Sequence, residues 1–455
     1  MDAPYPAHPV WRAAVVLKQR ISGWGRYPQV EAYIGEAQTP SAVRSLLETW
    51  PDCIPRGSGK SYGDSALSER VLLMEPLNRI LSFDPELGEV VCEAGVSLAK
   101  LIDVFLPRGF FPAVTPGTKR ITVGGALASD VHGKNHHRAG CFSSCINWFD
   151  LLLADGRIVR CSREENGDLF RATCGGMGLT GVILIVCLRL QRVKSAWIDQ
   201  VTVYCKDLDA VLTAFDDYAH TSYSVAWIDC LSTGTHLGRS VLMVGEHADS
   251  GGLLPPCGRQ AAVPFDFPDG VLNPTSIRLF NTGYAWIHRR NAGESRVPID
   301  AFFYPLDGID HWNRMYGKRG FLQYQFVLPR SEGADGLYAM LSAIAAEGMG
   351  SFLAVLKLFG PANDHFLSFP MEGYTLALDF AIRPGLFPFL DRLDRLLVRF
   401  GGRIYLTKDV RMSPGVFRSG YPGLERFLEI KAAVDPQNRF RSLQSSRLME
   451  GACMC

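Results

Sequence analysis

Three glycine-rich segments lie within the first 181 residues, and they restrict the fold more than any other feature of this 455-residue chain. The first reads Pro55-Arg56-Gly57-Ser58-Gly59-Lys60-Ser61-Tyr62-Gly63-Asp64. Closely spaced glycines let a loop turn successive N–H groups inward, which forms a concave site for a pyrophosphate. The segment has neither the GxxxxGK[ST] spacing of a P-loop nor the GxGxxG spacing of a Rossmann fold. Taken alone, it is equally well an ordinary glycine-rich turn.

The second segment keeps small residues over a whole stretch, from Thr115-Pro116-Gly117-Thr118 through Thr122-Val123-Gly124-Gly125-Ala126-Leu127-Ala128. A flat ligand can lie directly on such a backbone, although close helix–strand packing needs small residues too. Ser129-Asp130-Val131-His132-Gly133-Lys134-Asn135-His136-His137 follows. The histidines suggest zinc, but no acidic or cysteine partner stands at ligand spacing, so no metal is predicted.

The third segment, Gly175-Gly176-Met177-Gly178-Leu179-Thr180-Gly181, leads into an apolar strand that begins at Val182. One such loop is weak evidence for a ligand. Three of them in one part of the chain predict a long cofactor that carries phosphates.

The length predicts two domains. Up to about residue 196, short strands alternate with helical segments such as 42–50 and 97–105, and Ala154-Asp155-Gly156 predicts a tight hairpin turn. From Trp197 onward, strands (197–203, 322–328, 375–382) alternate with longer helices (208–219, 336–347, 387–399), and a helix is predicted at 423–434. Residues 251–274 are rich in Gly and Pro and predict a long surface loop.

Composition excludes some functions. A net charge of +1 gives no field for nucleic acid. The twelve cysteines are scattered as in reduced proteins, and neither Cys141/Cys145 nor Cys453/Cys455 has the CxxC spacing of zinc sites. Residues 1–6 lack the basic start of a signal peptide, and 182–188 is too short to cross a bilayer. We therefore expect a cytoplasmic protein, with peripheral membrane contact left open.

The motifs R-G-S-G-K-S-Y-G-D, P-G-T…V-G-G-A…D-V-H-G-K-N-H-H and G-G-M-G-L-T-G together resemble the FAD-binding domain of the vanillyl-alcohol-oxidase/p-cresol-methylhydroxylase superfamily. Within it, the chain is most similar to the decaprenylphosphoryl-β-D-ribose 2′-oxidase family, which residues 22–26, 321–326, 357–361 and 405–409 also resemble. The resemblance implies an α+β, two-domain flavoprotein. Its FAD domain would come from both chain ends (1–196 and 403–455), around an inserted sheet-plus-helices substrate domain at 197–402.

The resemblance also implies the cofactor. Many relatives attach the flavin covalently through a histidine at the place of Lys60, and a lysine cannot form that bond, so FAD is predicted to be non-covalent. The residues expected to hold it are Arg56, Gly57, Ser58, Gly59, Lys60, Ser61, Tyr62, Pro116, Gly117, Thr118, Thr122, Gly124, Gly125, Ala128, Ser129, Val131, His132, Gly133, Asn135, Gly178, Val182 and Tyr405.

Hydride removal from a secondary alcohol needs an acceptor for the hydroxyl proton, a substrate stacked at flavin N5, and positive charge near N1–C2=O. Lys408 and Tyr62 are the candidates, and the resemblance adds His132 beside the flavin. The residues expected at the substrate are Gln323, Gln325, Lys357, Thr375, Ala377, Trp227 and Phe303. Without the resemblance, the lysine and the glutamines would be taken for exposed positions on strands.

Three of these positions depart from the family. Ala377 stands where a cysteine is usual, Thr375 where an asparagine is usual, and Phe303 in place of a pocket tyrosine. The 251–274 loop also differs. The sugar or its carrier therefore need not be the family's own.

The implied reaction is FAD-dependent oxidation of a secondary alcohol on a ribosyl sugar, free or linked to a polyprenyl phosphate, to a keto sugar. It would be the first half of a 2′-epimerisation that a separate NAD(P)H-dependent reductase completes. One alternative is a free-sugar or alditol oxidase that uses oxygen. The other is a flavin-fold binding subunit without catalysis.

Overall fold

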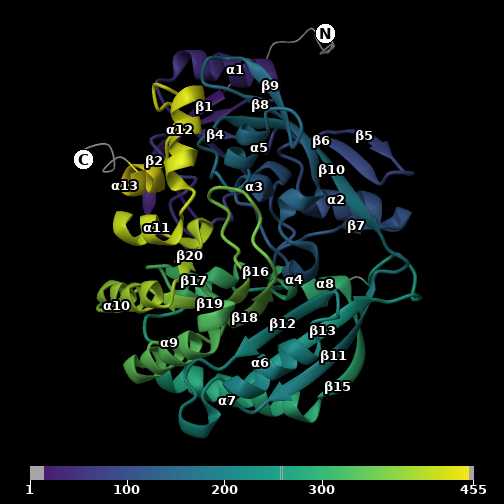
Figure 1. Cartoon of the computed structure of the whole chain (residues 1–455), viewed down its shortest axis with the longest axis vertical. Coiled ribbons are helices and arrows are strands. Elements are labelled where there is room, and N and C mark those ends of the chain that lie inside the picture. Colours follow the sequence, from purple (N-terminus) through teal and green to yellow (C-terminus); the bar gives the residue numbers. More distant parts are fainter. Residues whose placement is uncertain (1–14, 257, 259, 450–455) are drawn as a thin grey trace.

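The computed structural model describes residues 15–449 except 257 and 259, so the predictions for residues 1–6 and for Cys453/Cys455 lie outside it. Two regions are stacked along the long axis of the molecule (Figure 1). The upper region contains both the first and the last of the described residues, and the lower region is built on one large sheet. The chain therefore leaves the upper region, forms the lower one and returns.

The upper region contains two sheets. A four-stranded sheet has the order β1 (Val15–Ser22), β2 (Gln29–Glu36), β4 (Arg70–Leu73), β3 (Ile54–Arg56). The second sheet has the order β5 (Ile80–Asp84), β6 (Glu89–Glu93), β10 (Val182–Arg192), β8 (Ile146–Leu152), β9 (Ile158–Ser162), with β7 (Phe110–Pro112) also paired to β10. The helices of this region are α1 (Pro40–Thr49), α2 (Leu98–Phe105), α3 (Val123–Ala128), α4 (His136–Ala139) and α5 (Gly167–Thr173).

Helix α2 shows how the sequence pattern forms these elements. Its N-cap Ser97 accepts a hydrogen bond from the Lys100 N–H, and Leu98, Leu101, Ile102 and Phe105 are buried on one face, as their spacing predicts. The turn predicted at 154–156 joins β8 to β9, with Gly156 at φ +85°. The positive φ explains the glycine.

The lower region is an eight-stranded sheet in the order β15-β11-β13-β12-β18-β19-β17-β20. Its strands are β11 (Trp197–Cys205), β12 (Tyr223–Ile228), β13 (Ser240–His247), β15 (Gly293–Pro298), β17 (Phe321–Pro329), β18 (Ala354–Phe359), β19 (Gly373–Ala381) and β20 (Arg403–Ile404). All of its strand pairs are antiparallel.

One face of this sheet packs against α6 (Leu208–Asp217), α9 (Gly333–Glu347) and α10 (Leu386–Arg399). The other face is partly covered by α7 (Pro274–Arg290), which packs on β11 and β13. Two short elements, α8 (Ile299–Phe303) and β16 (Ile309–Asp310), lie towards the upper region, and β16 pairs with β14 (Ala261–Ala262).

The C-terminal segment contains α11 (Pro414–Gly420), α12 (Leu424–Val434) and α13 (Leu443–Met449) and is bonded to the upper region. Cys53 bridges to Phe440 in parallel, and the Arg439 guanidinium donates to the carbonyls of Trp50 (2.8 Å) and Ala154 (2.6 Å). Arg447 pairs with Asp64 at 2.9 Å and with Asp409 at 3.0 Å. These bonds hold the end of the chain against the first glycine-rich segment.

Two elements differ from what the sequence suggested. Residues 123–128 form a helix, which the stretch of small residues did not specify, since it suits a flat ligand as well as close helix–strand packing. Helix α7 was not predicted, because its apolar residues are spread over most of its circumference. No helix among residues 15–449 outside the two gaps is long and apolar enough to cross a membrane.

Candidate active site

The register of the large sheet places six of the seven predicted substrate residues on one face. Gln325 lies opposite Ala377, Ala377 opposite Val355, and Val355 opposite Trp227. Lys357 lies opposite Thr375, and Gln323 lies opposite Asp379. Directly opposed residues of antiparallel strands point to the same side, so side chains from four strands share this face. The upper region approaches the same face.

His132 is the residue of the upper region that meets the centre of this face. Its Nε2 lies 3.0 Å from Nε2 of Gln325, which also donates to Thr375 Oγ1 at 3.3 Å. Burial, followed by the charges of Lys357, His136 and Lys408, holds the pKa of His132 well below its usual value, so the ring is neutral. A neutral ring accepts the amide proton of Gln325 at Nε2 and carries its own proton on Nδ1. That Nδ1 is buried and has no hydrogen-bond partner among the described residues, so a bound ligand could satisfy it.

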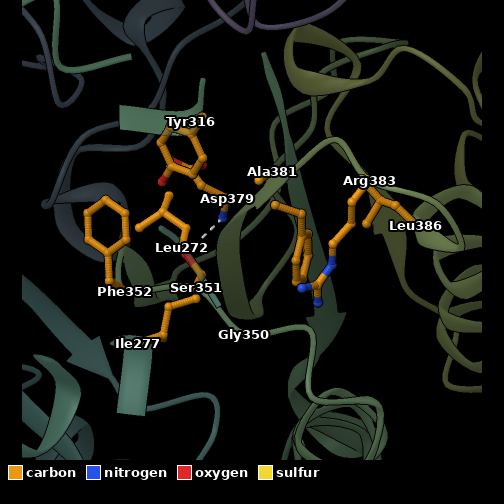
Figure 2. A pocket seen from close by; sticks show the side chains of 11 residues that line it. Leu272, Ile277, Tyr316, Gly350, Ser351, Phe352, Asp379, Ala381, Arg383 and Leu386 are labelled. Atoms are coloured by element: carbon orange, nitrogen blue, oxygen red, sulfur yellow. Dashed lines mark hydrogen bonds between the residues drawn. The ribbon is translucent and has the colours of Figure 1, made fainter. Parts of the chain in front are cut away.

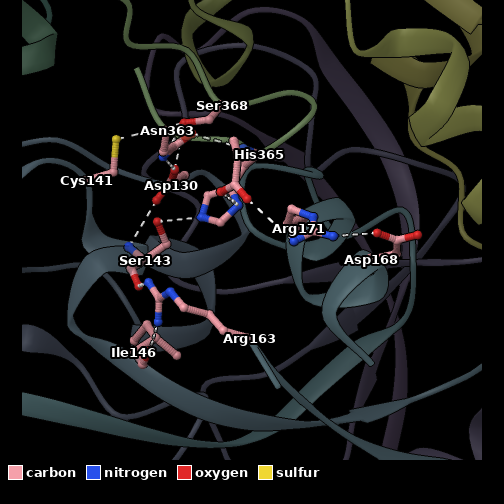
Figure 3. A network of polar contacts seen from close by, with 11 residues as sticks. Asp130, Cys141, Ser143, Ile146, Arg163, Asp168, Arg171, Asn363, His365 and Ser368 are labelled. Carbon is pink, nitrogen blue, oxygen red and sulfur yellow. Dashed lines mark hydrogen bonds and ion pairs between the residues drawn. The ribbon is translucent and has the colours of Figure 1, made fainter. Parts of the chain in front are cut away.

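The turn that carries His132 is clamped by a buried polar network (Figure 3). Asp130 adopts φ +39° and accepts bonds from the Ser143 N–H (3.0 Å), Ser368 Oγ (2.6 Å) and Asn363 Nδ2 (2.8 Å). His365 in turn lies 3.0 Å from Ser143 Oγ. The network therefore joins the second glycine-rich segment to residues 363–368 and fixes the position of His132.

Lys408 lies at the other end of the site, in the short turn that follows β20. Its Nζ lies 3.7 Å from the centre of the Tyr62 ring, a cation–π distance. Burial lowers the pKa of Lys408 to about 7, an effect that Asp379 opposes and Lys357 reinforces. Burial raises the pKa of the Tyr62 hydroxyl well above its usual value, and Gln323, its hydrogen-bond partner, acts against that shift.

Asp379 is a site residue that sequence reasoning missed. It accepts a hydrogen bond from Gln323 Nε2 at 2.7 Å and one from the Tyr316 hydroxyl at 3.3 Å. Burial raises its pKa to about 7, against the opposing effects of Gln323 and Lys408. The alternation of Thr375, Ala377 and Asp379 along a strand was the signal that could have placed it on the same face.

A small cavity of about 10 Å³ lies behind Asp379 (Figure 2). Tyr316, Ser351 and Phe352 are among its lining residues, and Ser351 Oγ accepts the Asp379 N–H at 3.2 Å. A space of this size holds about one water molecule. The carboxyl group therefore has little water on that side, which agrees with its raised pKa.

Two further lysines, Lys357 and Lys134, lie half-buried at the site. Burial lowers the pKa of Lys357 to about 8, and burial together with Lys357 lowers that of Lys134 to about 7. Lys134 Nζ donates to the Phe302 carbonyl and lies 4.4 Å from the Phe302 ring centre. The Lys357 ammonium forms no ion pair with any described residue, so a bound anion would find it free.

The first glycine-rich segment follows β3 and forms an open cradle. None of the four N–H groups of residues 58–61 donates to another described residue, although these residues are half-buried. Gly59 has φ +61°, and a Cβ on Gly63 would lie 1.7 Å from the Asp409 carbonyl oxygen. Four consecutive free N–H groups in such a turn suit a pyrophosphate.

The charged side chains of this segment are engaged elsewhere. The Arg56 guanidinium donates to the carbonyls of Ser22 (2.7 Å) and Ala66 (3.1 Å), and Lys60 Nζ lies 3.8 Å from the centre of the Trp24 ring. The cradle therefore offers its backbone and the hydroxyls of Ser58 and Ser61 to a ligand.

The start of the second glycine-rich segment is fixed by hydrogen bonds and an ion pair to the lower region. Thr118 Oγ1 and the Lys119 N–H both donate to Asp307, at 2.7 and 2.9 Å, and Arg120 pairs with Asp310 at 2.7 Å. Apart from its two chain neighbours, no described residue has an atom within 4 Å of where a Cβ on the exposed Gly117 would stand. The loop is thus fixed while Gly117 opens onto free space.

Several other predicted residues stabilise the glycine-rich segments by capping, packing and hydrogen bonds. Thr122 caps α3 through the Gly125 N–H, Gly124 packs against Ala94, and Asn135 Nδ2 donates to the Ala113 carbonyl. Tyr405 donates to the Ser129 carbonyl at 3.0 Å. Val182 is fully buried and Gly178 (φ +77°) packs against Pro55, so both lie in the packing beneath the cradle.

The structure does not bring Phe303 to the site, where it was expected. Its ring is buried in an aromatic cluster with Phe111, Tyr223 and Tyr304. Trp227 is on the site face but is largely covered: its Nε1 donates to the Phe352 carbonyl, and its ring packs on Tyr284 of α7.

Comparison with known proteins agrees with this geometry. Residues 36–162 match the family model described as an FAD binding domain. The chain is 36% identical over 451 residues to decaprenylphosphoryl-β-D-ribose oxidase of Mycolicibacterium smegmatis, covering 94% of this chain and 97% of that protein. It is 34% identical to an uncharacterised protein of Streptomyces coelicolor, over 78% of this chain and all of that protein. With L-gulonolactone oxidase of Mus musculus it shares 32% identity over 29% of this chain and 30% of that protein.

The open cradle and the matched domain together define an FAD-dependent oxidoreductase that acts on CH–OH groups. More particularly, the chain belongs to the family of decaprenylphosphoryl-β-D-ribose oxidase. The free N–H groups of residues 58–61 and the open space at Gly117 fit the FAD that this family model describes.

Proposed function

We propose that this protein oxidises a secondary alcohol of a ribosyl sugar to a ketone, as the first half of an epimerisation at C2. The observation that carries the proposal is the position of Lys408, which contacts the Tyr62 ring and is electrostatically coupled to Asp379, beside the FAD-binding cradle. In this arrangement the upper region and the returning C-terminal segment form the FAD domain, and the large sheet forms the substrate domain.

FAD, when bound, supplies the acceptor for the hydride. We expect the N–H groups of residues 58–61 to bind its pyrophosphate and Gly117 to lie against it. Residues 55–64 contain neither histidine nor cysteine, and Lys60 is stacked on Trp24, so this loop offers no covalent attachment. The cofactor is therefore proposed to be dissociable.

We assign each side chain of the site a separate role in the oxidation of the alcohol. The Tyr62 hydroxyl, hydrogen-bonded to Gln323, is positioned to bind the hydroxyl of the sugar. Asp379, whose pKa is about 7, is able to accept the released proton near neutral pH. The Lys408 ammonium supplies positive charge where the reduced cofactor becomes anionic. His132 and Gln325 orient the sugar from the centre of the sheet face.

The carrier of the sugar is proposed to bear a phosphate, because Lys357, whose pKa of about 8 leaves it protonated at neutral pH, forms no ion pair with any described residue. Ala377 and Thr375 stand where the family has a cysteine and an asparagine and remove polar contacts, so the sugar or its carrier need not be the family's own. A separate NAD(P)H-dependent reductase would convert the keto sugar to the epimer. The ribosyl assignment is supported by the likeness to the Mycolicibacterium protein over 94% of the chain.

A sugar oxidase that uses oxygen is the second candidate, because L-gulonolactone oxidase also matches. That match covers 29% of the chain, whereas the likeness to the Mycolicibacterium protein covers 94% of it. The likeness over nearly the whole chain therefore favours the first candidate.

The test is an anaerobic titration of the purified yellow protein. Polyprenyl-phosphoryl ribose should bleach the flavin, while free ribose and an alditol should do so far more slowly, and heat denaturation should release the FAD into solution. Steady peroxide formation in air at the rate of substrate loss would support the oxygen-using oxidase. A colourless protein that takes up no FAD would support the non-catalytic alternative.

A further inference from the structure

Helix α7 presents its larger apolar side chains to solvent. The helix spans Pro274–Arg290, and the residues it buries against the sheet are Ile277, Asn281 and Ala285. Four larger apolar residues are exposed instead: Leu279 (76%), Phe280 (47%), Trp286 (57%) and Ile287 (49%). A surface helix normally buries its apolar face, so this arrangement indicates a face that another surface covers.

The exposed apolar residues form a continuous strip. At 100° per residue, Leu279, Phe280, Trp286 and Ile287 fall within a sector about 120° wide on the side away from the sheet. Gly283 lies in the same sector and leaves the strip flat. The exposed Val271, whose carbonyl accepts a bond from Ser276 Oγ, adjoins the start of the helix.

The charges of the helix have one sign. Residues 274–290 contain Arg278, Arg289 and Arg290 and no Asp or Glu. None of the three arginines forms an ion pair with any described residue, and the Arg290 guanidinium stacks 4.5 Å from the Trp286 ring centre. Arg278 and Arg289 border the apolar strip on one side. Apolar residues with Trp and a basic edge are the pattern of helices that lie in a membrane interface.

The strip is close to the proposed active site. Phe280 packs on Phe352 (5.6 Å between ring centres), and Phe352 stacks on Tyr316 (5.7 Å), which donates to Asp379. On its inner side, α7 packs on Trp227, which shares the sheet face with Lys357 and Gln325. A surface bound to α7 would therefore lie beside the substrate pocket.

We propose that the exposed face of α7 binds the surface of a bilayer that contains anionic lipid, with Leu279 and Trp286 entering the headgroup region and the arginines contacting lipid phosphates. A second copy of the chain fits less well, because a two-fold contact through α7 would bring arginines together with no acidic residue of the helix to pair them. Membrane docking does not depend on the function proposed above. Delivery of a lipid-linked sugar to the pocket by this docking does rest on that function.

The test is flotation of the FAD-loaded protein with phosphatidylcholine vesicles, with and without phosphatidylglycerol. The protein should float with the anionic vesicles and remain unbound with the neutral ones. The double variants Leu279→Ser/Trp286→Ser and Arg278→Gln/Arg289→Gln should each lose at least about tenfold in vesicle affinity. The matched control Leu87→Ser/Tyr338→Ser, which removes two exposed apolar residues of other elements, should bind as the unchanged protein does.

Equal binding of the α7 variants and the control, or equal binding to both kinds of vesicle, would overturn the proposal. So would light scattering that shows a dimer which Leu279→Ser/Trp286→Ser converts to a monomer, without vesicle binding by the unchanged protein. FAD content and unfolding temperature should not change in any variant. Vesicle binding with no bleaching by any ribosyl lipid would instead contradict the proposed function and leave the docking intact.

Discussion

The two walls of the site are built by different means. The cradle at residues 58–61 and the loop around Gly117 present backbone N–H groups and open space, while the charged side chains nearby are bonded elsewhere. The sheet face and the turn after β20 present side chains: Gln325, Lys357, Asp379 and Lys408. The first wall should therefore be sensitive to added volume, and the second to changes of charge and hydrogen bonding.

The largest effect is expected on the side-chain wall. Lys408→Met removes the positive charge beside Tyr62 and keeps much of the volume. It should slow flavin reduction by about 10³-fold, the usual cost of losing a charge-stabilising group. FAD should remain bound, since Lys408 is not part of the cradle. Stopped-flow absorbance under anaerobic conditions measures the rate, and reduction at an unchanged rate would remove Lys408 from the proposed chemistry.

The backbone wall should respond to a single methyl group. Gly117→Ala adds a Cβ that would have no described atom within 4 Å apart from its chain neighbours, so the protein without FAD should unfold at an unchanged temperature. When FAD binds, the methyl group should contact the cofactor. The free energy of FAD binding should weaken by about 1–3 kcal/mol, which is about 5- to 150-fold in affinity.

Gly63→Ala is the matched comparison for that variant, because its Cβ would lie 1.7 Å from the Asp409 carbonyl oxygen. It should destabilise the protein even without FAD. Fluorescence titration of FAD and thermal unfolding of both variants separate the two effects. A loss of stability in Gly117→Ala equal to that in Gly63→Ala would show that Gly117 packs against protein.

The side-chain wall should also respond to pH. Burial lowers the pKa of Lys408 to about 7, so Lys408 loses its proton as the pH rises through that value. Burial raises the pKa of Asp379 to about 7, so Asp379 gains a proton as the pH falls through it. Flavin reduction should therefore be fastest near pH 7 and fall by several-fold two units to either side, with both limbs belonging to the coupled pair. In Asp379→Asn the acidic limb should disappear, and its persistence would assign that limb to another group.

The smallest effect is expected at Ala377. Ala377→Cys places a thiol on the sheet face opposite Gln325 and Val355, and should change the rate of flavin reduction by less than about twofold, since it adds little volume. It should, however, make the site open to thiol-directed reagents, which mass spectrometry of the intact protein would detect. Equal alkylation of the unchanged protein and of Ala377→Cys would contradict this expectation.

The same contrast explains what the sequence predicted. The cradle was predictable because glycine spacing is local, and so was α2, whose apolar period is regular. The sheet face unites residues from 227 to 379 through strand register, which no local pattern encodes, and its members were found through the family resemblance. Asp379 was missed because a single carboxylate in an apolar strand gives no spacing signal. Phe303 was misplaced because the sequence does not show into which cluster a ring packs.

The most direct test of the central claim is the rate of anaerobic flavin reduction by polyprenyl-phosphoryl ribose that carries deuterium at C2 of the ribose. Removal of that hydrogen as hydride predicts a reduction slowed several-fold relative to the unlabelled substrate, with a 2-keto sugar as the product. An unchanged rate with the C2 label, together with slowing by deuterium at another carbon, would contradict oxidation at C2.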